Sequence, residues 1–440
     1  MNYTRLMEKA LASGFSDLEV YESYNRELTI SIFNGKLEKN VQSEMTTVTI
    51  RAIYEGKMAY LQLENTAEKP EFILNSLKNN ATSLTTDEKF SIFEGSKRYP
   101  RTKKSPCDFD AHNNAEKIDL LMKIETTIRG IDARIMMVPY CQYNENVSRV
   151  RIVNSKGLKV KKANHYAALI TQAVARENED SQSGFEIQVK HQFQDLDMQK
   201  ICETVAKKTV AMLNAKSIAS KEYPVIIQNE TMGDLFASFQ SIFSGEAAIK
   251  KITPLLGKEE QSIASPLISI IDAPLKKDAI FTHPFDDEGV ACYDKKVVDK
   301  GVFKTFLHNL KTAQYFNTQS TGNGFKQGAN VGVSGTNFYI APGKTTKESL
   351  IAKIKEGLLI TELDGLHAGV NPISGDFSLK ASGFLIVDGK VSRPVSLIVM
   401  AGNFFNLLNQ VEAVASDLYL SVNGIGAPSI KINKIAISGE

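Results

Sequence analysis

The sequence predicts an α+β protein in which an N-terminal α/β region precedes a mainly β C-terminal domain. Two observations indicate this: helical patterns alternate with β-rich hairpins before residue 220, and glycine-rich strands dominate beyond it. Hydrophobic residues make up 42% of the chain, which is ordinary for a soluble globular protein. A chain of 440 residues is too long for one ordinary domain. At this size it can bury a large core without help from a metal or a disulfide.

Two units of helix, hairpins and helix are predicted before residue 220. In the first, helices over 3–13 and 68–79 flank strands over 18–21, 28–33, 46–54 and 58–63, with turns at Asn34-Gly35 and Glu55-Gly56. In the second, a helix over 115–129 precedes strands over 135–143, 147–153 and 165–175, and a helix capped by Asp197 runs to residue 213. The recurrence is compatible with an internal duplication.

Beyond residue 220, strands are predicted over 225–227 and, paired through Asp388-Gly389, across 384–400. Lys300-Gly301 predicts another hairpin turn. Helices are predicted over 230–243, with Asn229 or Thr231 as the cap, and over 346–356 and 404–411. Polar joints at 91–110 and 216–222 divide the chain into regions 1–105, 106–220 and 221–440.

The charge balance argues against nucleic-acid binding. Lys and Arg number 52 and Asp and Glu 50, a net charge of +2, whereas nucleic-acid-binding domains carry a clear basic excess. Basic residues gather in the joint at 91–110, but no aromatic ladder accompanies them, so a solvated loop is the favoured interpretation. They are Lys97, Arg98, Arg101, Lys103 and Lys104.

Compartment signals favour the cytosol. The four cysteines are scattered without a Cys-x-x-Cys pair, which is typical of reduced thiols. The first ten residues are polar and do not resemble a secretory signal. No apolar run approaches the roughly 20 residues that span a bilayer. We therefore expect a cytoplasmic protein that does not bind membranes.

No familiar catalytic motif is present. None of the six histidines is followed by Glu, which excludes the His-Glu-x-x-His pattern that binds zinc on one face of a helix. No Gly-x-Ser-x-Gly elbow marks a serine nucleophile. Cys107 and His112 lie close in sequence, but structural zinc needs four donors, so a ligand role for this pair is disfavoured.

Three adjacent acidic residues in the run 283–289 are unusual for a segment with a purely structural role. Asp286, Asp287 and Glu288 stand between Phe285 and Gly289. Their oxygens suit calcium or magnesium, a peptide-binding role, or an exposed acidic turn held by Phe285 and ended by Gly289. The exposed turn is favoured over the metal site.

Two further segments are rich in small residues. The loop 320–324 around Asn323 lets a ligand approach the backbone closely. The segment 369–383 fits equally a groove wall or a string of bulges and turns. With Asn323 and the three acids, its residues Gly375, Asp376, Ser378 and Gly383 are candidates for a peptide groove or a partner interface.

Taken in order, these segments resemble the C-terminal domain of the TldD/TldE (PmbA) metalloprotease family, once called modulators of DNA gyrase. The resemblance rests on the runs 284–290, 320–323, 357–363, 375–378, 381–384, 401–403 and 427–429. In the N-terminal half it rests on the hairpin around Asn34-Gly35-Lys36 and the run 48–60. It covers nearly the whole chain.

The resemblance implies a division of labour between two branches. TldD-like members look like zinc peptidases with a His-Glu-x-x-x-His helix and a late Cys ligand. TldE-like members lack these ligands and pair with a TldD-like subunit, and the heterodimer cleaves extended or unfolded peptides. Here Glu246 remains in the run 241–250 without a flanking His, and the run 401–409 has no Cys. The chain therefore resembles the TldE-like branch, with no catalytic residue, metal or cofactor of its own and zinc on its partner.

The leading hypothesis is a zinc-less subunit, at least dimeric, whose segment 375–383 forms a wall where a peptide adds as a strand. One alternative is a self-sufficient peptidase that uses His283 and the three adjacent acids as metal ligands. Another is a regulator that binds DNA gyrase, suggested only by the older family name.

Overall fold

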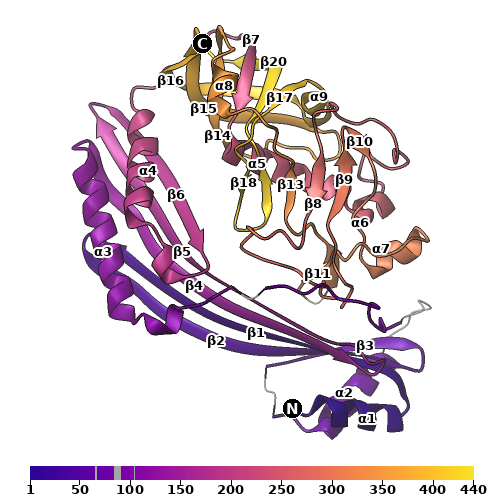
Figure 1. Cartoon of the computed structure of the whole chain (residues 1–440). Coiled ribbons are helices and arrows are strands. Elements are labelled where there is room, and N and C mark those ends of the chain that lie inside the picture. The colour runs from indigo at the N-terminus through magenta and orange to yellow at the C-terminus, as the bar shows by residue number, and fades with distance from the viewer. Residues whose placement is uncertain (65–66, 84–90, 104, 329) are drawn as a thin grey trace.

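The computed structural model describes residues 1–64, 67–83, 91–103, 105–328 and 330–440. Helices make up 23% and strands 43% of the described residues, which confirms the α+β class. A long curved sheet from the N-terminal half runs beneath a β-rich C-terminal domain (Figure 1). No helix of the described residues is both long and apolar enough to cross a membrane.

The N-terminal half forms one antiparallel sheet of six strands. Its strands β1 and β4 pair along most of their length, so residues before and after the joint at 91–110 share a single sheet. In spatial order the strands are β3 (Lys57–Leu63), β2 (Lys36–Tyr54), β1 (Phe15–Phe33), β4 (Ile135–Asn154), β5 (Lys159–Glu177) and β6 (Asp180–Lys190).

Four of these strands are far longer than predicted. The strands expected over 18–21 and 28–33 are one 19-residue strand, and those over 135–143 and 147–153 are one 20-residue strand. The polar runs between them stay in the sheet because neighbouring strands on both sides satisfy their backbone groups. Both predicted hairpin turns are confirmed, since Asn34 and Glu55 adopt the positive φ that such turns need.

Helices cover the outer face of this sheet at both of its ends (Figure 1). They are α1 (Tyr3–Ala12) and α2 (Pro70–Thr82) at one end and α3 (Asn114–Ile131) and α4 (Met198–Ala211) at the other. Each pair packs on its own core cluster. Asp197 caps α4 as predicted, because its carboxylate accepts the Lys200 N–H at 2.9 Å.

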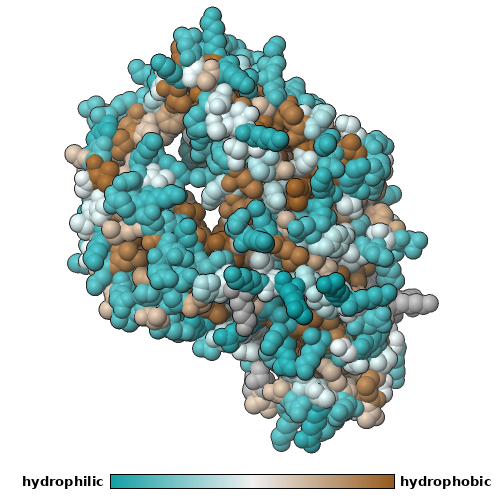
Figure 2. All heavy atoms as spheres, in the orientation of Figure 1, coloured by the Kyte–Doolittle hydropathy of each residue, from teal (hydrophilic) through white to brown (hydrophobic). Residues whose placement is uncertain are grey.

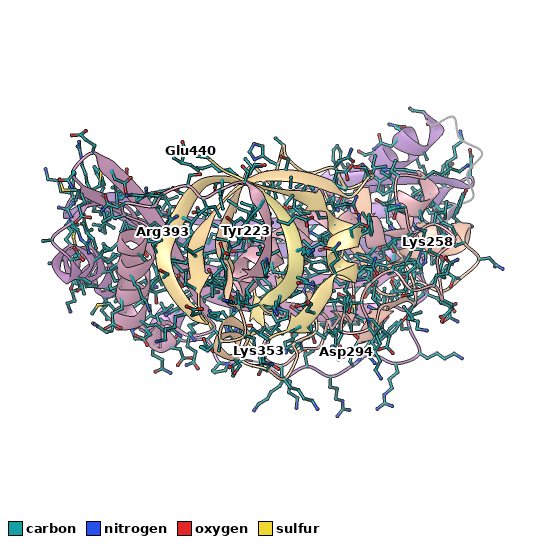
Figure 3. The ribbon with its side chains drawn as sticks, turned by 90° about the horizontal axis from the view of Figure 1, so that it is seen from above. Tyr223, Lys258, Asp294, Lys353, Arg393 and Glu440 are labelled. Carbon is teal, nitrogen blue, oxygen red and sulfur yellow. The ribbon has the colours of Figure 1, made fainter. Side chains whose placement is uncertain are left out.

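The C-terminal domain contains two six-stranded sheets and a small hairpin. The first sheet runs β16 (Lys390–Asn403), β15 (Asp376–Val387), β14 (Glu356–Asp364), β7 (Lys221–Ile227), β20 (Ile430–Ser438) and β17 (Val411–Val414). Because β16 also pairs with β20, five strands of this sheet close into a ring. Figure 3 looks down on these curved strands, with Tyr223 of β7 and Arg393 of β16 labelled.

The second sheet faces the core from the other side. It runs β10 (Val302–Phe303), β9 (Lys295–Asp299), β8 (Ile270–Asp272), β13 (Phe338–Ile340), β19 (Ile425–Ala427) and β18 (Tyr419–Leu420). The remaining elements are α6 (Gly245–Ile249), α7 (Leu310–Tyr315), β11 (Gly324–Gln327), β12 (Asn330–Val333), α8 (Lys347–Ile351) and α9 (Phe404–Asn409). Hairpin turns at Lys300-Gly301 and Asp388-Gly389 join β9 to β10 and β15 to β16, as predicted.

Helix α5 (Asn229–Phe239) contacts β14 of the first sheet and β19 of the second. Its Phe236 and Phe239 are fully buried in the domain core. The helix predicted over 230–243 ends earlier, and a 3-10 turn over Gln240–Phe243 follows. The predicted cap is wrong: Gln228 takes that position, and the Asn229 side chain instead reaches the Asp417 carbonyl at 2.7 Å.

Strand β15 contains most of the segment expected to offer a free edge to a peptide. It pairs with β16 on one side, and on the other side it pairs with β14 from Lys380 onward and with the segment 369–371 at 376–378, so that edge-strand hypothesis is wrong for 376–383. Register shifts around Gly383 mark bulges. An added Cβ at Gly383 would lie 1.9 Å from the Leu359 carbonyl oxygen, so the glycine allows two strands to approach.

We predict that Gly383→Ala lowers the free energy of unfolding by about 1–3 kcal/mol, because the β14–β15 backbone must shift. The matched control is Gly130→Ala in α3, where an added Cβ meets nothing within 4 Å. There the same change should stabilise the protein by about 0.5–1 kcal/mol. Urea unfolding followed by circular dichroism measures both; equal effects of the two substitutions would contradict this role for Gly383.

Candidate functional site

A large cleft separates the sheet from the C-terminal domain. Its volume is about 1560 Å³, and its walls come from β1, β2 and β3 on one side and from α6, α7, the β11–β12 hairpin and the turn 287–291 on the other. These elements face each other in Figure 1. A second cavity of about 560 Å³ lies further along the sheet, between β6 and the segment 419–422. Figure 2 shows that the molecule is hollowed between the part bearing α3 and α4 and the C-terminal domain.

Side chains of β1 and β2 alternate between the two faces of the sheet, and those on one face form a wall of the cleft. Leu18 and Val20 point into the core below α1 and α2, so Glu19 and Tyr21 point the other way. Glu19 stands opposite Arg51 on β2 and accepts its Nε–H at 2.7 Å. The second carboxylate oxygen of Glu19 accepts from Asn154 at 3.3 Å. Arg51 Nη2 is buried and has no hydrogen-bond partner among the described residues.

Asp286 is buried, although an exposed acidic turn was the favoured interpretation of its segment. Its carboxylate accepts the N–H groups of Glu288, Val290 and Gly324 at 2.9–3.0 Å. Burial, reinforced by the neighbouring Glu288 carboxylate, raises the pKa of Asp286. The exposed-turn interpretation is therefore wrong, because these backbone donors replace the water that an acidic turn would otherwise need.

Asp287 joins the two halves of the molecule. One oxygen lies 3.1 Å from Lys162 Nζ of β5, and the other accepts the Lys326 N–H at 3.1 Å. The Tyr21 hydroxyl is a further partner. Burial opposes ionisation of Asp287, but Lys162, the Lys326 N–H and the Tyr21 hydroxyl together outweigh it and lower the pKa of the carboxyl. Lys162 also donates to the Phe285 carbonyl at 3.0 Å, which fixes the whole turn against the sheet.

Glu288 lines the cleft beside the start of α7. Its Oε2 accepts the Leu310 N–H at 2.7 Å, at the helix N-terminus where a negative charge is favoured. Burial raises the pKa of Glu288. An added Cβ at Gly324 would come within 2.4 Å of that oxygen, so this contact requires glycine there.

The joint at 91–110 packs against the same turn, while its basic residues Lys97, Arg98, Arg101 and Lys103 are exposed to solvent, as the loop interpretation expected. Tyr99 donates to the Gly289 carbonyl at 2.6 Å, and Ser96 Oγ accepts the Ala291 N–H at 2.9 Å. The Phe93 carbonyl accepts from Asn154 of the sheet at 2.7 Å. The segment thus straps the sheet to the C-terminal domain. Lys104, one of its predicted basic residues, lies outside the described residues.

Asn323 lies behind the cleft wall in a buried polar network. Its amide donates to Asp272 at 2.8 Å, and its oxygen accepts from Lys295 at 3.1 Å and from Thr321 at 2.7 Å. Lys295 and Asp272 form a buried ion pair of 2.8 Å. Asn323 therefore satisfies buried charges and does not face the cleft.

The hairpin of β11 and β12 places one open strand edge in the cleft. The acidic turn covers the outer side of β11, since Asp287 N–H donates to the Gly324 carbonyl at 2.8 Å and Asp287 accepts from Lys326. Among the described residues β12 pairs with no strand other than β11, although its Val331 carbonyl accepts from Asn309 Nδ2 at 3.2 Å. Asn330, Val331 and Gly332 of β12 line the cleft.

Helix α6 brings Glu246 to the cleft without metal-binding neighbours. Gly245 precedes it, and an added Cβ there would lie 2.6 Å from His308 Nδ1. His308 is buried, and its pKa is lowered to about 4 by that burial. Within the described part of the chain, no three His, Cys, Asp or Glu side chains cluster in a way that could hold a metal ion.

The structure divides the predicted candidates into two groups. Asp287 and Glu288 line the cleft, and Asp286 supports them from behind. The other candidates lie elsewhere in the C-terminal domain: Asn323, Gly375, Asp376, Ser378 and Gly383. Asp376 is exposed and bonds Asn403 at 2.9 Å, while an added Cβ at Gly375 would meet the Phe405 ring at 2.6 Å.

Sequence reasoning missed the sheet side of the cleft. Its charged and polar members include Glu19, Tyr21, Thr49 and Arg51, and Lys326 of β11, also missed, faces them from the opposite wall. The available signal was alternation: polar residues at 19, 21, 49 and 51 interleave with the buried apolar residues of both strands. That pattern indicates that one face of the sheet is polar, but it does not show which part of the protein lies opposite that face.

We predict that His283, buried beside Lys162, makes stability depend on acid pH. Burial, aided by Lys162, lowers its pKa from 6.5 to about 4, so folding favours the neutral ring. The stabilising contribution is complete above pH 6.5 and is lost as the pH falls through about 4. The difference in unfolding free energy between the natural protein and His283→Asn should shrink across this window.

The control for this measurement is His367→Asn, which replaces an exposed histidine. Its difference from the natural protein should stay flat over the same pH range. A flat difference for His283→Asn as well would contradict the prediction.

Comparison with known proteins places this geometry in one family. Models of the PmbA/TldA metallopeptidase domains match in order: domain 1 over residues 18–79, the central domain over 107–213 and the C-terminal domain over 220–439. The metalloprotease PmbA homolog of Buchnera aphidicola subsp. Acyrthosiphon pisum is 28% identical over 337 residues, 76% of this chain and 72% of that protein. Metalloprotease PmbA of Escherichia coli O157:H7 is 26% identical over 326 residues, 74% and 70% of the two chains.

Solved structures agree along the whole length. A protein from Thermotoga maritima MSB8, described as a modulator of a DNA gyrase, shares 31% identity with a TM-score of 0.93 over 99% of both chains. TldE from Thermococcus kodakarensis has a TM-score of 0.89 at 24% identity, over 99% of this chain and 100% of that one, a likeness of fold. Because the family models cover most of the sequence, the chain belongs to the PmbA/TldD metallopeptidase family.

Proposed function

We propose that this chain is a zinc-less, TldE-like subunit of a cytosolic metalloprotease complex that cleaves extended or unfolded peptides. The observation that carries the proposal is the packing of Gly245 against His308 beside Glu246 in the cleft. The chain has a metallopeptidase fold and this cleft, but helix α6 leaves no room for metal ligands beside Glu246. This combination fits a subunit that forms part of the path of the substrate.

The donor set argues against zinc held by this chain. With its Glu on Glu246, a His-Glu-x-x-x-His pattern puts the two histidines on Gly245 and Lys250. Neither glycine nor an ammonium group can bind zinc. A side chain at 245 would collide with His308, whose ring is held between Phe306 and Phe316. The late region, from the end of β16 into α9, contains no cysteine.

The cleft supports a role in peptide binding. Its volume of about 1560 Å³ exceeds the several hundred cubic ångströms typical of a small-molecule pocket. The open edge of β12 offers backbone groups to an added strand, a mode of binding that tolerates many sequences. This edge takes the place that β15 was expected to fill.

A partner supplies the chemistry in this proposal. The family includes both TldD and TldE proteins, and a TldD homolog described as a zinc metalloprotease, from Saccharolobus solfataricus, is 23% identical over 458 residues. The partner would be a TldD-like subunit with its own zinc, in a cytoplasmic heterodimer. Self-association of this chain in the partner's absence remains part of the proposal.

The two alternatives have less support. A metal site among His283, Asp286, Asp287 and Glu288 would compete with backbone donors and Lys162, which already occupy the carboxylates. The chain lacks the excess of basic residues that DNA binding would favour, since its net charge is +2. The gyrase connection comes only from the names of relatives such as the Thermotoga protein.

We predict that the purified chain carries no stoichiometric zinc and degrades no peptide alone. Mixed with a TldD-like subunit, it should accelerate degradation of an unfolded peptide beyond the rate of that subunit alone, and a chelator should stop the reaction. About one tightly bound zinc per chain would contradict the proposal. Chelator-sensitive degradation by the chain alone, as fast as by the mixture, would contradict it too.

Two variants sharpen the test. Lys250→His alone changes an exposed residue and should fold normally. The pair Gly245→His with Lys250→His restores both histidines but forces a side chain against His308. We expect neither variant to gain zinc or activity.

A further inference from the structure

Lys326 is a cation in the cleft without an acidic partner. It lies on β11, and its Nζ is 3.9 Å from the centre of the Tyr21 ring. Its Nζ forms no hydrogen bond or ion pair with the described residues. A partly buried ammonium group that rests only on an aromatic face keeps its capacity to bind an anion.

The nearby carboxylates are already engaged. Asp287 uses its oxygens for Lys162, the Tyr21 hydroxyl and the Lys326 backbone N–H. Glu19 uses its oxygens for Arg51 and Asn154. Neither therefore turns to the Lys326 ammonium group, although both are close enough to affect its charge.

Arg51 of β2 adds a second, incompletely paired cation on the opposite wall of the cleft. Its Nε is paired with Glu19, but Nη2 has no acceptor among the described residues. Burial and the Arg51 charge together lower the pKa of Lys326 to about 8, against the attraction of Asp287. Two cations that raise the cost of each other's charge in one cleft form a site that favours an anion.

We propose that Lys326 and Arg51 bind a carboxylate of an extended peptide in the cleft. The carboxylate is the C-terminal group of the peptide or one of its acidic side chains. This inference rests on the proposed function, because it takes the cleft as the path of the peptide. Lys326 lies on β11 opposite Val331 of β12, so only one strand separates it from a chain that adds to β12.

The test measures binding to the isolated full chain. The ligand is an uncharged peptide of Gly, Ala and Ser with an acetylated N-terminus and a neutral fluorophore, prepared in three forms. One has a free C-terminal carboxylate, one has a C-terminal amide, and one has the amide and a single internal Glu. Fluorescence anisotropy at fixed ionic strength gives the affinity of each form.

We expect at least one carboxylate form to bind about tenfold more tightly than the neutral amide, the scale of a hydrogen bond to a charged group. The form that gains affinity identifies the source of the carboxylate. Lys326→Gln should abolish the gain, and Lys326→Arg should restore most of it. Lys344→Gln, which removes an exposed charge outside the cleft, should leave the gain unchanged.

The pH dependence separates charge from shape. With Lys326, the gain should fall as the pH rises through about 8, because the ammonium group loses its proton. Glu19, Tyr21, Arg51 and Asp287 face this group, and Asp286 and Glu288 lie behind it. The Lys326→Arg variant keeps its charge, so its gain should stay level if Lys326 is the titrating group.

Equal affinity for all three peptides, including no binding by any, would overturn the inference. A gain that survives Lys326→Gln would overturn it as well. Neither result touches the proposed function, which depends on zinc content and on proteolysis by the mixture. Conversely, a carboxylate-dependent gain in a chain that fails to accelerate its partner would support this site and contradict the proposed function.

Discussion

The buried ion pair between Lys162 and Asp287 is the interaction on which the arrangement of this protein depends. Lys162 belongs to β5 of the curved sheet, and Asp287 belongs to the turn 287–291 in the C-terminal wall of the cleft. Both side chains are largely buried, with 8% and 12% of their surface exposed. Removing either partner would leave an uncompensated buried charge, which is far more costly than breaking a surface pair.

The cleft follows from that connection. Asp286 shapes the turn through three backbone N–H groups, so Asp287 can reach the sheet while Glu288 reaches α7. The same turn covers the outer side of β11 and leaves β12 open. One short acidic segment thus fixes the distance between the two walls and determines which strand edge a peptide can meet.

Local chemistry made much of the fold predictable. Asn34 and Asp388 take positive φ in the turns expected of them, and Asp197 caps its helix. The length of β1 and β4 was not predictable, because their polar middle sections are held between two strands, one of which is distant in sequence. The burial of Asp286 was missed for a similar reason: its donor Gly324 lies 38 residues away. Arg51 and Lys326 are far apart in sequence and are brought to one cleft only by the tertiary fold, so no sequence motif identifies their site.

A double-mutant cycle on Lys162 and Asp287 tests this account most directly. The free energies of unfolding of Lys162→Met, Asp287→Asn, the double variant and the natural protein give the coupling between the two side chains. We predict a coupling of at least about 1.5 kcal/mol, as found for close charge pairs removed from water. A coupling below about 0.5 kcal/mol, the range of independent sites, would contradict the claim that this pair joins the sheet to the C-terminal domain.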